Sequence, residues 1–145
     1  MYKYLPYSKY AYDMTAIKQT SVIQENKSSA FAACPVTFVM EKIGGYWKPI
    51  ILFNLMTGTK RYNELKRAIP AITEKMLIQH LKQLEEDRLV VRRSKPVVPP
   101  YVTYELSKQG KALRPVLFAM AEWAVSNGGK QSRQFRKQME DFPAE

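Results

Sequence analysis

Hydrophobic residues recur every three or four positions along most of residues 35–127, and this spacing predicts a mainly helical chain. Five helices are expected, at 35–43, from about 47 to the stop signal at 57–58, at 62–69, from 73 to about 87, and from 107 to about 127. Pro35 suits the first turn of the first helix, and Thr73 is a good N-cap for the fourth. Leu77, Leu81 and Leu84 form the core stripe of that fourth helix.

Two strand patterns follow the fourth helix, at 89–93 and 101–106, and the second alternates clearly. The segment between them, 94–100, carries three prolines and is too long for a tight turn, so it predicts a hairpin loop. Residues 60–62 are expected to be a short extended link. Two helices joined by 70–72 and followed by a basic hairpin have the order of a winged helix-turn-helix. The expected fold class is therefore mainly α with a small β-hairpin wing (α+β).

The chain is expected to consist of three parts. Residues 31–127 form a winged helix-turn-helix domain for DNA binding and dimerisation, and residues 128–145 form a tail with a weak polar helix at 130–139. Residues 1–30 form an arm and linker that hold five of the nine tyrosines. This arm is either an extension without fixed structure or a segment that packs on a partner subunit through its tyrosine rings. The sequence leaves both interpretations open.

The first helix and the last strong helix carry more apolar surface than a core of four helices and a hairpin can bury. We therefore expect these two helices to form a homodimer interface. The residues assigned to it are Val36, Val39, Met40, Leu117, Met120 and Trp123.

The composition narrows the class of protein. The 145 residues are 46% hydrophobic and 25% charged, which permits one hydrophobic core and excludes a wholly disordered chain. No run of 18 apolar residues suggests a membrane span, and no apolar signal region follows the N-terminus, so a cytoplasmic protein is expected. One cysteine and one histidine argue against a disulfide within the chain and against a zinc site, and no cofactor is expected.

Positive charge is concentrated in the middle of the chain. The formal net charge is +10, and residues 60–95 hold ten Lys and Arg against five Asp and Glu, so this quarter of the chain carries half of the excess. Because the cluster coincides with the helix-turn-helix pattern, double-stranded DNA is the expected partner.

The fourth helix is expected to enter the major groove with its N-terminal part. Its outward residues at 100° per residue are of types that contact base edges. The base-reading candidates are Thr73, Lys75, Met76, Gln79 and Gln83. Other cations and one histidine are candidates for phosphate or minor-groove contacts around this helix and on the wing. These candidates are Lys60, Arg61, Lys66, Arg67, His80, Arg92, Arg93 and Lys95.

Cys34 lies just before Pro35, at a predicted helix N-terminus, where the helix dipole stabilises a thiolate. An exposed thiol of low pKa is a candidate redox or electrophile sensor. The alternative is a small, partly buried packing residue, and both stay open.

Several short motifs occur in a specific order along the chain. They are Cys34-Pro35-Val36, Ile43-Gly44-Gly45-x-Trp47-Lys48, Arg61-Tyr62-Asn63-Glu64-Leu65, Leu81-x-x-Leu84-Glu85-Glu86-Asp87 and Pro99-Pro100-x-Val102-x-Tyr104-x-Leu106. Over residues 34–127 this set resembles the HxlR-type branch of MarR-like winged-helix transcriptional regulators. The resemblance implies a cytoplasmic homodimer that binds two-fold-symmetric operators. It also implies a glycine after the fourth helix, where this chain has Arg88.

The function expected from the sequence is a DNA-binding transcriptional regulator that acts as a homodimer, with a small-molecule or oxidant effector left open. The alternative is a winged-helix module that binds protein or RNA through its basic face. An enzyme is not expected, because the chain has no phosphate-binding glycine loop, no nucleophile elbow and no paired carboxylates.

Overall fold

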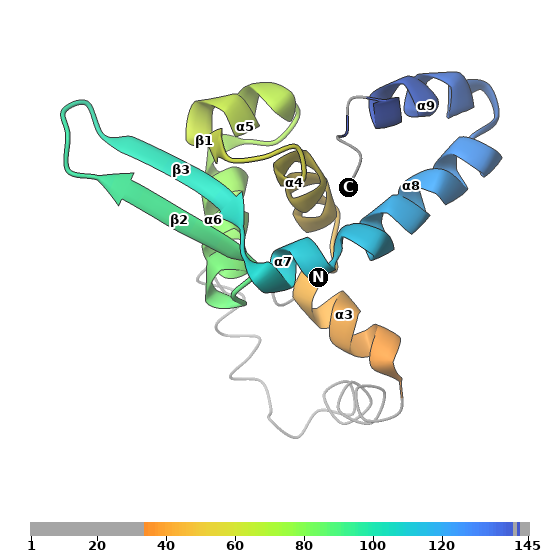
Figure 1. The fold of residues 1–145 in the computed structure, drawn as a ribbon, viewed down its shortest axis with the longest axis horizontal. Coiled ribbons are helices and arrows are strands. Elements are labelled where there is room, and N and C mark those ends of the chain that lie inside the picture. The colour runs from red at the N-terminus through yellow and green to blue at the C-terminus, as the bar shows by residue number, and fades with distance from the viewer. Residues whose placement is uncertain (1–33, 141, 143–145) are drawn as a thin grey trace. The chain divides into compact units, whose positions relative to one another are not determined.

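The computed structural model describes residues 34–140 and Phe142 (Figure 1). The expected arm at 1–30 lies outside the described residues. The chain divides into two compact units, Met1–Gly45 and Tyr46–Glu145. In the first unit the structure describes α3, Pro35–Ile43, with Pro35 in its first turn. The N–H of Gly44 donates to the carbonyl oxygen of Met40 at 2.8 Å and ends α3, as the sequence predicts.

The second unit contains six α-helices, one short 3-10 helix and three strands among its described residues. Their order is α4 (Trp47–Leu55), β1 (Lys60–Arg61), α5 (Tyr62–Ala68), α6 (Glu74–Glu86), β2 (Val90–Lys95), β3 (Tyr101–Leu106), α7 (Lys108–Ala112), α8 (Arg114–Asn127), η2 (Gly129–Gln131) and α9 (Ser132–Glu140). This order is that of a winged helix-turn-helix, and it confirms the predicted fold class. No helix in the described part of the chain is long and apolar enough to span a membrane.

The prediction of one continuous helix over 107–127 is wrong, because the structure has two. α7 ends at Ala112 and α8 begins at Arg114, with Pro115 in the first turn of α8. Pro115 has no N–H, and its ring would clash with the carbonyl four residues earlier, so a helix cannot continue through this point without a kink. Ser107 caps α7 by accepting a hydrogen bond from the N–H of Gly110 at 3.0 Å.

Three antiparallel strands form the sheet in the order β1-β3-β2, and the β2–β3 hairpin projects beyond α5 and α6 as the wing (Figure 1). β1 was expected only as an extended link, but Lys60 pairs with Tyr104 and Arg61 with Thr103. β2 extends to Lys95, which pairs with Tyr101, so the hairpin loop is shorter than predicted. β1 therefore connects the start of α5 directly to the wing.

The core of the second unit lies where α4, α5, α6 and the sheet meet. Ile51 and Leu52 of α4 and Leu65 of α5 are fully buried. The predicted stripe of Leu77, Leu81 and Leu84 on α6 is also buried. Burial of each side chain of this size stabilises a fold by roughly 1.5–3 kcal/mol.

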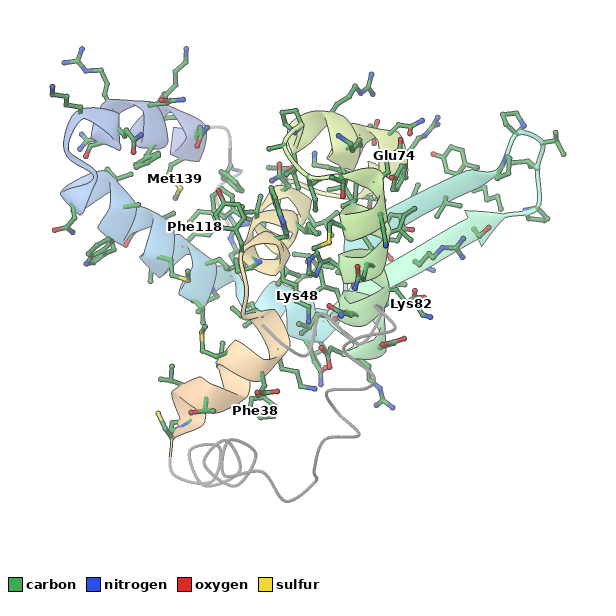
Figure 2. All side chains as sticks on the ribbon, turned by 180° about the vertical axis from the view of Figure 1, so that it is seen from behind. Phe38, Lys48, Glu74, Lys82, Phe118 and Met139 are labelled. Carbon is green, nitrogen blue, oxygen red and sulfur yellow. The ribbon has the colours of Figure 1, made fainter. Side chains whose placement is uncertain are left out.

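A buried charge pair connects α4 to the C-terminal end of α6. The ammonium of Lys48, on α4, lies 3.6 Å from a carboxylate oxygen of Asp87, and the Lys48 side chain is 1% exposed (Figure 2). The next residue, Arg88, has φ 59°, a left-handed conformation that glycine adopts more easily. The chain thus keeps the backbone turn that the family resemblance implies, with arginine in place of glycine.

Candidate nucleic-acid interface

The N-terminal end of α6 is presented to solvent by a well-defined cap. The hydroxyl of Thr73 accepts a hydrogen bond from the N–H of Met76 at 3.2 Å, as the sequence predicts for an N-cap. The chain turns from α5 into α6 at Ile69 to Thr73, and Ile69 and Ile72 in this turn are buried. The turn therefore fixes the position at which α6 begins.

The outward face of α6 carries both charged and apolar side chains. Lys75 and Lys82 are exposed, Ile78 is 55% exposed, and Met76 and Gln79 are half-buried. Figure 2 labels two residues of α6, Glu74 in its first turn and Lys82 about two turns later. Four of the five predicted base-reading residues, Thr73, Lys75, Met76 and Gln79, thus lie at or near the surface over the first two turns.

Gln83 and His80 do not lie on this face, and the expectation that they contact DNA is corrected here. Gln83 is 7% exposed and His80 is 4% exposed. Nδ1 of His80 lies 3.3 Å from the side-chain oxygen of Gln83, so the two form a polar pair inside the unit. Burial lowers the pKa of His80, the contact with Gln83 raises it, and the nearby charge of Lys48 lowers it further. His80 is therefore held neutral in the interior.

The cations expected near α5 lie in different environments. Arg61 and Arg67 are exposed, whereas Lys60 and Lys66 are half-buried. The backbone N–H of Arg61 donates to the carboxylate of Glu64 at 2.6 Å, which closes the first turn of α5. The ammonium of Lys66 donates to the carbonyl oxygen of Pro70 at 3.2 Å and so satisfies an acceptor just after α5.

On the wing, the strand register places three cations on one face of the sheet. Directly opposed residues of antiparallel strands share a face, so Arg61, Arg93 and Lys95 lie on the same side as Tyr101. The guanidinium of Arg61 lies 4.1 Å from the centroid of the Tyr101 ring, and the ammonium of Lys95 lies 5.1 Å from it. Both distances fit cation–π contacts, so Tyr101 holds cations from β1 and β2 near each other.

Arg93 and Arg92 lie in environments that differ from those of Arg61 and Lys95. The guanidinium of Arg93 donates to the carboxylate of Glu105 at 2.7 Å, and this hydrogen bond lowers the pKa of Glu105. The hydroxyl of Thr59 also donates to Glu105, at 3.3 Å. Arg92 pairs with Tyr104 in the register, so it lies on the opposite face of the sheet, and it is exposed.

Sequence reasoning missed the contacts of Tyr101 and Glu105 and the exposure of Ile78. The alternation of β3 puts Tyr101 and Glu105 on one face, but the cations beside them come from β1 and β2, whose register the sequence does not specify. Ile78 directly follows the core residue Leu77, and sequence reasoning did not single it out. Ile78 lies three residues after the charged Lys75, on the same side of the helix, and this spacing is the signal that indicates its exposure.

The predicted dimerisation residues are mostly exposed. Val36 is 63% exposed and Met40 56% on α3, and Met120 is 54% exposed and Trp123 69% on α8. Val39 is half-buried. Leu117 is 3% exposed, and it lines a cavity of about 640 Å³ bordered by α4, α8 and α9. Leu117 is therefore corrected to a residue of the unit's interior.

Cys34 is exposed and stands at the N-cap of α3. Hydrogen bonds from the backbone N–H groups of Val36 and Thr37 lower the pKa of its thiol. The interpretation of Cys34 as a partly buried packing residue does not fit this exposure.

The comparisons with known proteins agree with this geometry. The family model described as HxlR-like helix-turn-helix matches residues 42–132. The chain belongs to the HxlR family of helix-turn-helix transcriptional regulators. The matched range includes every helix and strand from α4 to α8, so the HxlR-like part of the chain includes both α6 and the wing.

Relatives in the HxlR family are transcriptional regulators. The HTH-type transcriptional regulator YybR of Bacillus subtilis is 44% identical over 94 residues, which cover 65% of this chain and 75% of YybR. YtfH of Escherichia coli, also named an HTH-type transcriptional regulator, is 36% identical over 113 residues, which cover 77% of this chain and 90% of YtfH.

Solved structures of similar proteins include two with redox states in their titles. The redox regulator HypR in its oxidized form is 44% identical, with a TM-score of 0.62 over 65% of this chain and 97% of that chain. The reduced form of the transcriptional regulator YodB from B. subtilis is 37% identical, with a TM-score of 0.57 over 65% of this chain and 93% of that chain.

Proposed function

We propose that this HxlR-family regulator binds double-stranded DNA sequence-specifically, as a homodimer on a two-fold-symmetric operator. The observation that carries the proposal is the outward face of α6. This face begins at a capped helix N-terminus and presents Lys75 and Lys82, while exposed cations of α5 and the wing lie on neighbouring elements. Such an arrangement fits the major groove, with cations positioned to neutralise phosphates.

Base edges are assigned to four side chains of α6 and its cap. Lysine suits guanine O6 and N7, glutamine suits adenine N6 and N7, and methionine suits the thymine methyl. The residues are Thr73, Lys75, Met76 and Gln79. Backbone contacts are assigned to the cations of α5 and the wing that are exposed or half-buried. These are Lys60, Arg61, Lys66, Arg67, Arg92, Arg93 and Lys95.

The homodimer is proposed to form through α3 and α8. Exposed Val36, Met40, Met120 and Trp123 are large apolar side chains in contact with solvent, and a partner subunit would cover them. A Trp123→Asp variant should then shift the protein toward the monomer in light scattering after gel filtration. A Glu122→Gln variant, altered at the exposed neighbouring residue, is the matched control.

The test of DNA binding is a gel shift with duplexes selected from a random pool. Half-sites should be centred about one helical turn apart, ~10–10.5 bp, or a multiple of it. Gln79→Ala should cost about 1–3 kcal/mol on the selected site and little on random DNA. Arg92→Ala should weaken both alike and reduce the salt slope by about one unit. Equal affinity for all duplexes, or a complex that salt does not weaken, would refute the proposal.

We further propose that Cys34 makes this regulator responsive to oxidants. Its exposure and lowered thiol pKa support this role, and so does the similarity to proteins titled as redox regulators. With diamide, two Cys34 thiols from two chains would lose two protons and two electrons to the diazene and form one disulfide.

The oxidant response is tested by operator affinity before and after diamide, followed by a thiol reductant. The affinity of the wild-type protein should change and then recover, whereas Cys34→Ser should bind the operator and show no response. An alkylation rate of Cys34 equal to that of an unperturbed thiol, with unchanged affinity after oxidation, would reject this role.

A further inference from the structure

Ile78 differs from the other large side chains of the helix-turn-helix. In α5 and α6, both fully described, Ile78 is the only large hydrophobic residue that is exposed, at 55%. The leucines of α6 at 77, 81 and 84 are buried in the core. Ile78 therefore presents apolar surface to solvent from the middle of the helix that is expected to enter the major groove.

The neighbours of Ile78 on the helix surface are cationic. Ile78 lies three residues after Lys75 and four before Lys82, so the three side chains form one continuous strip along the outward face. Both lysines are exposed. With Lys75 on a base edge and Lys82 on a phosphate, the base edges between them would lie close to Ile78.

The major groove offers one apolar group to such a side chain, the C5-methyl of thymine. A β-branched residue in a helix has one strongly preferred χ1 rotamer, so Ile78 presents a stiff surface that loses little freedom on contact. We propose that Ile78 is a specificity-determining residue that packs against a thymine methyl in the operator. This inference rests on the proposed function, since it requires α6 to lie in the major groove.

The experiment removes the methyl from the DNA and the side chain from the protein. The full-length protein first selects a duplex from a random pool, and each thymine of that duplex is then replaced singly by deoxyuridine. At one thymine of the half-site, the wild-type protein should lose about four-fold in affinity, the factor expected for one buried group of this size. Ile78→Ala should bind the thymine and uracil duplexes equally well at that position.

Two controls make the result specific. Lys82→Ala alters the same strip, and it should weaken binding to all duplexes while keeping the four-fold preference for thymine. Ile78→Ala changes an exposed residue to a better helix former, so its thermal unfolding should match that of the wild-type protein.

The possible outcomes distinguish a failure of this inference from a failure of the proposed function. A pool that yields no enriched duplex overturns the proposed function and this inference with it. A selected duplex in which no uracil substitution distinguishes wild type from Ile78→Ala overturns the inference alone, and leaves sequence-specific binding intact. That second result would make a protein partner the better candidate for covering Ile78.

Discussion

Replacing the carboxylate of Asp87 is expected to destabilise the winged helix-turn-helix by about 3 kcal/mol. The ammonium of Lys48 lies 3.6 Å from this carboxylate. Two unit charges about 4 Å apart attract by roughly 4 kcal/mol at an effective dielectric constant near 20. Removing one partner of a buried pair costs about 3–5 kcal/mol, because the other charge stays desolvated. The lower end applies here, since the Asp87 side chain is 19% exposed and already partly hydrated.

The two ends of the pair should respond unequally to substitution. Asp87→Asn leaves an ammonium in a side chain that is 1% exposed, whereas Lys48→Met keeps the apolar stem and leaves a carboxylate that can recover water. Lys48→Met should therefore lower the free energy of unfolding by about 1 kcal/mol. In a protein that already carries Lys48→Met, Asp87→Asn should lower it by a further ~0.5 kcal/mol or less. The coupling energy between the two substitutions should then be about 2.5 kcal/mol.

Urea unfolding at equilibrium, at one fixed protein concentration, measures these differences even if the protein is a dimer. Glu86→Gln is the matched control, because Glu86 is exposed at the same helix end, and its free energy of unfolding should stay within about 0.5 kcal/mol of wild type. A cost below about 1 kcal/mol for Asp87→Asn, or an equal cost with and without Lys48→Met, would refute the reasoning.

Three further predictions concern the same unit. Arg88→Gly should raise the free energy of unfolding by about 0.5–1 kcal/mol, because φ 59° strains arginine but not glycine, and a lower urea midpoint would contradict this. Burial lowers the pKa of His80 from 6.5, so its contribution to stability is complete above pH 6.5 and is lost as the pH falls through its folded pKa. The free energy of unfolding of His80→Gln should therefore depend less on pH than that of the wild type between about pH 7.5 and pH 5. Tyr101→Leu should weaken DNA binding several-fold more than Tyr101→Phe, which keeps the ring beside Arg61 and Lys95, and equal losses in gel shifts would rule out a role for the ring.

The helices of this protein could be predicted because their signals are local. Pro35, the cap at Thr73 and the leucine stripe of α6 each act within a few residues, and the structure has those features where the sequence places them. The break between α7 and α8 also had a local signal, Pro115, which the sequence-based interpretation did not use. Periodicity indicates which residues share a face, and it does not show whether the backbone hydrogen bonds continue.

The burial of Gln83 and His80 could not be predicted from the helix alone. At 100° per residue, His80 falls 60° to one side of Leu77, and Gln83 falls 120° to that same side. Whether this flank is buried depends on the neighbouring helix that covers it. Here α4 packs against α6, and the charge of Lys48 on α4 lies near enough to lower the pKa of His80. His80 and Gln83, which sequence reasoning assigned to DNA, are thus a buried polar pair inside the unit.

The contacts across the strands of the wing could not be predicted from the sequence either. Alternation along β3 predicts that Tyr101, Thr103 and Glu105 share a face, but not which residues lie opposite them. The register brings Arg93 to Glu105 and both Arg61 and Lys95 to Tyr101, so three cations that looked equivalent in the sequence differ in the structure. Arg93 must exchange a carboxylate for a phosphate when it binds DNA, whereas a cation held on an aromatic ring keeps its full charge. Arg61 and Lys95 should therefore contribute more to the affinity for DNA than Arg93, although all three are basic residues of the same face.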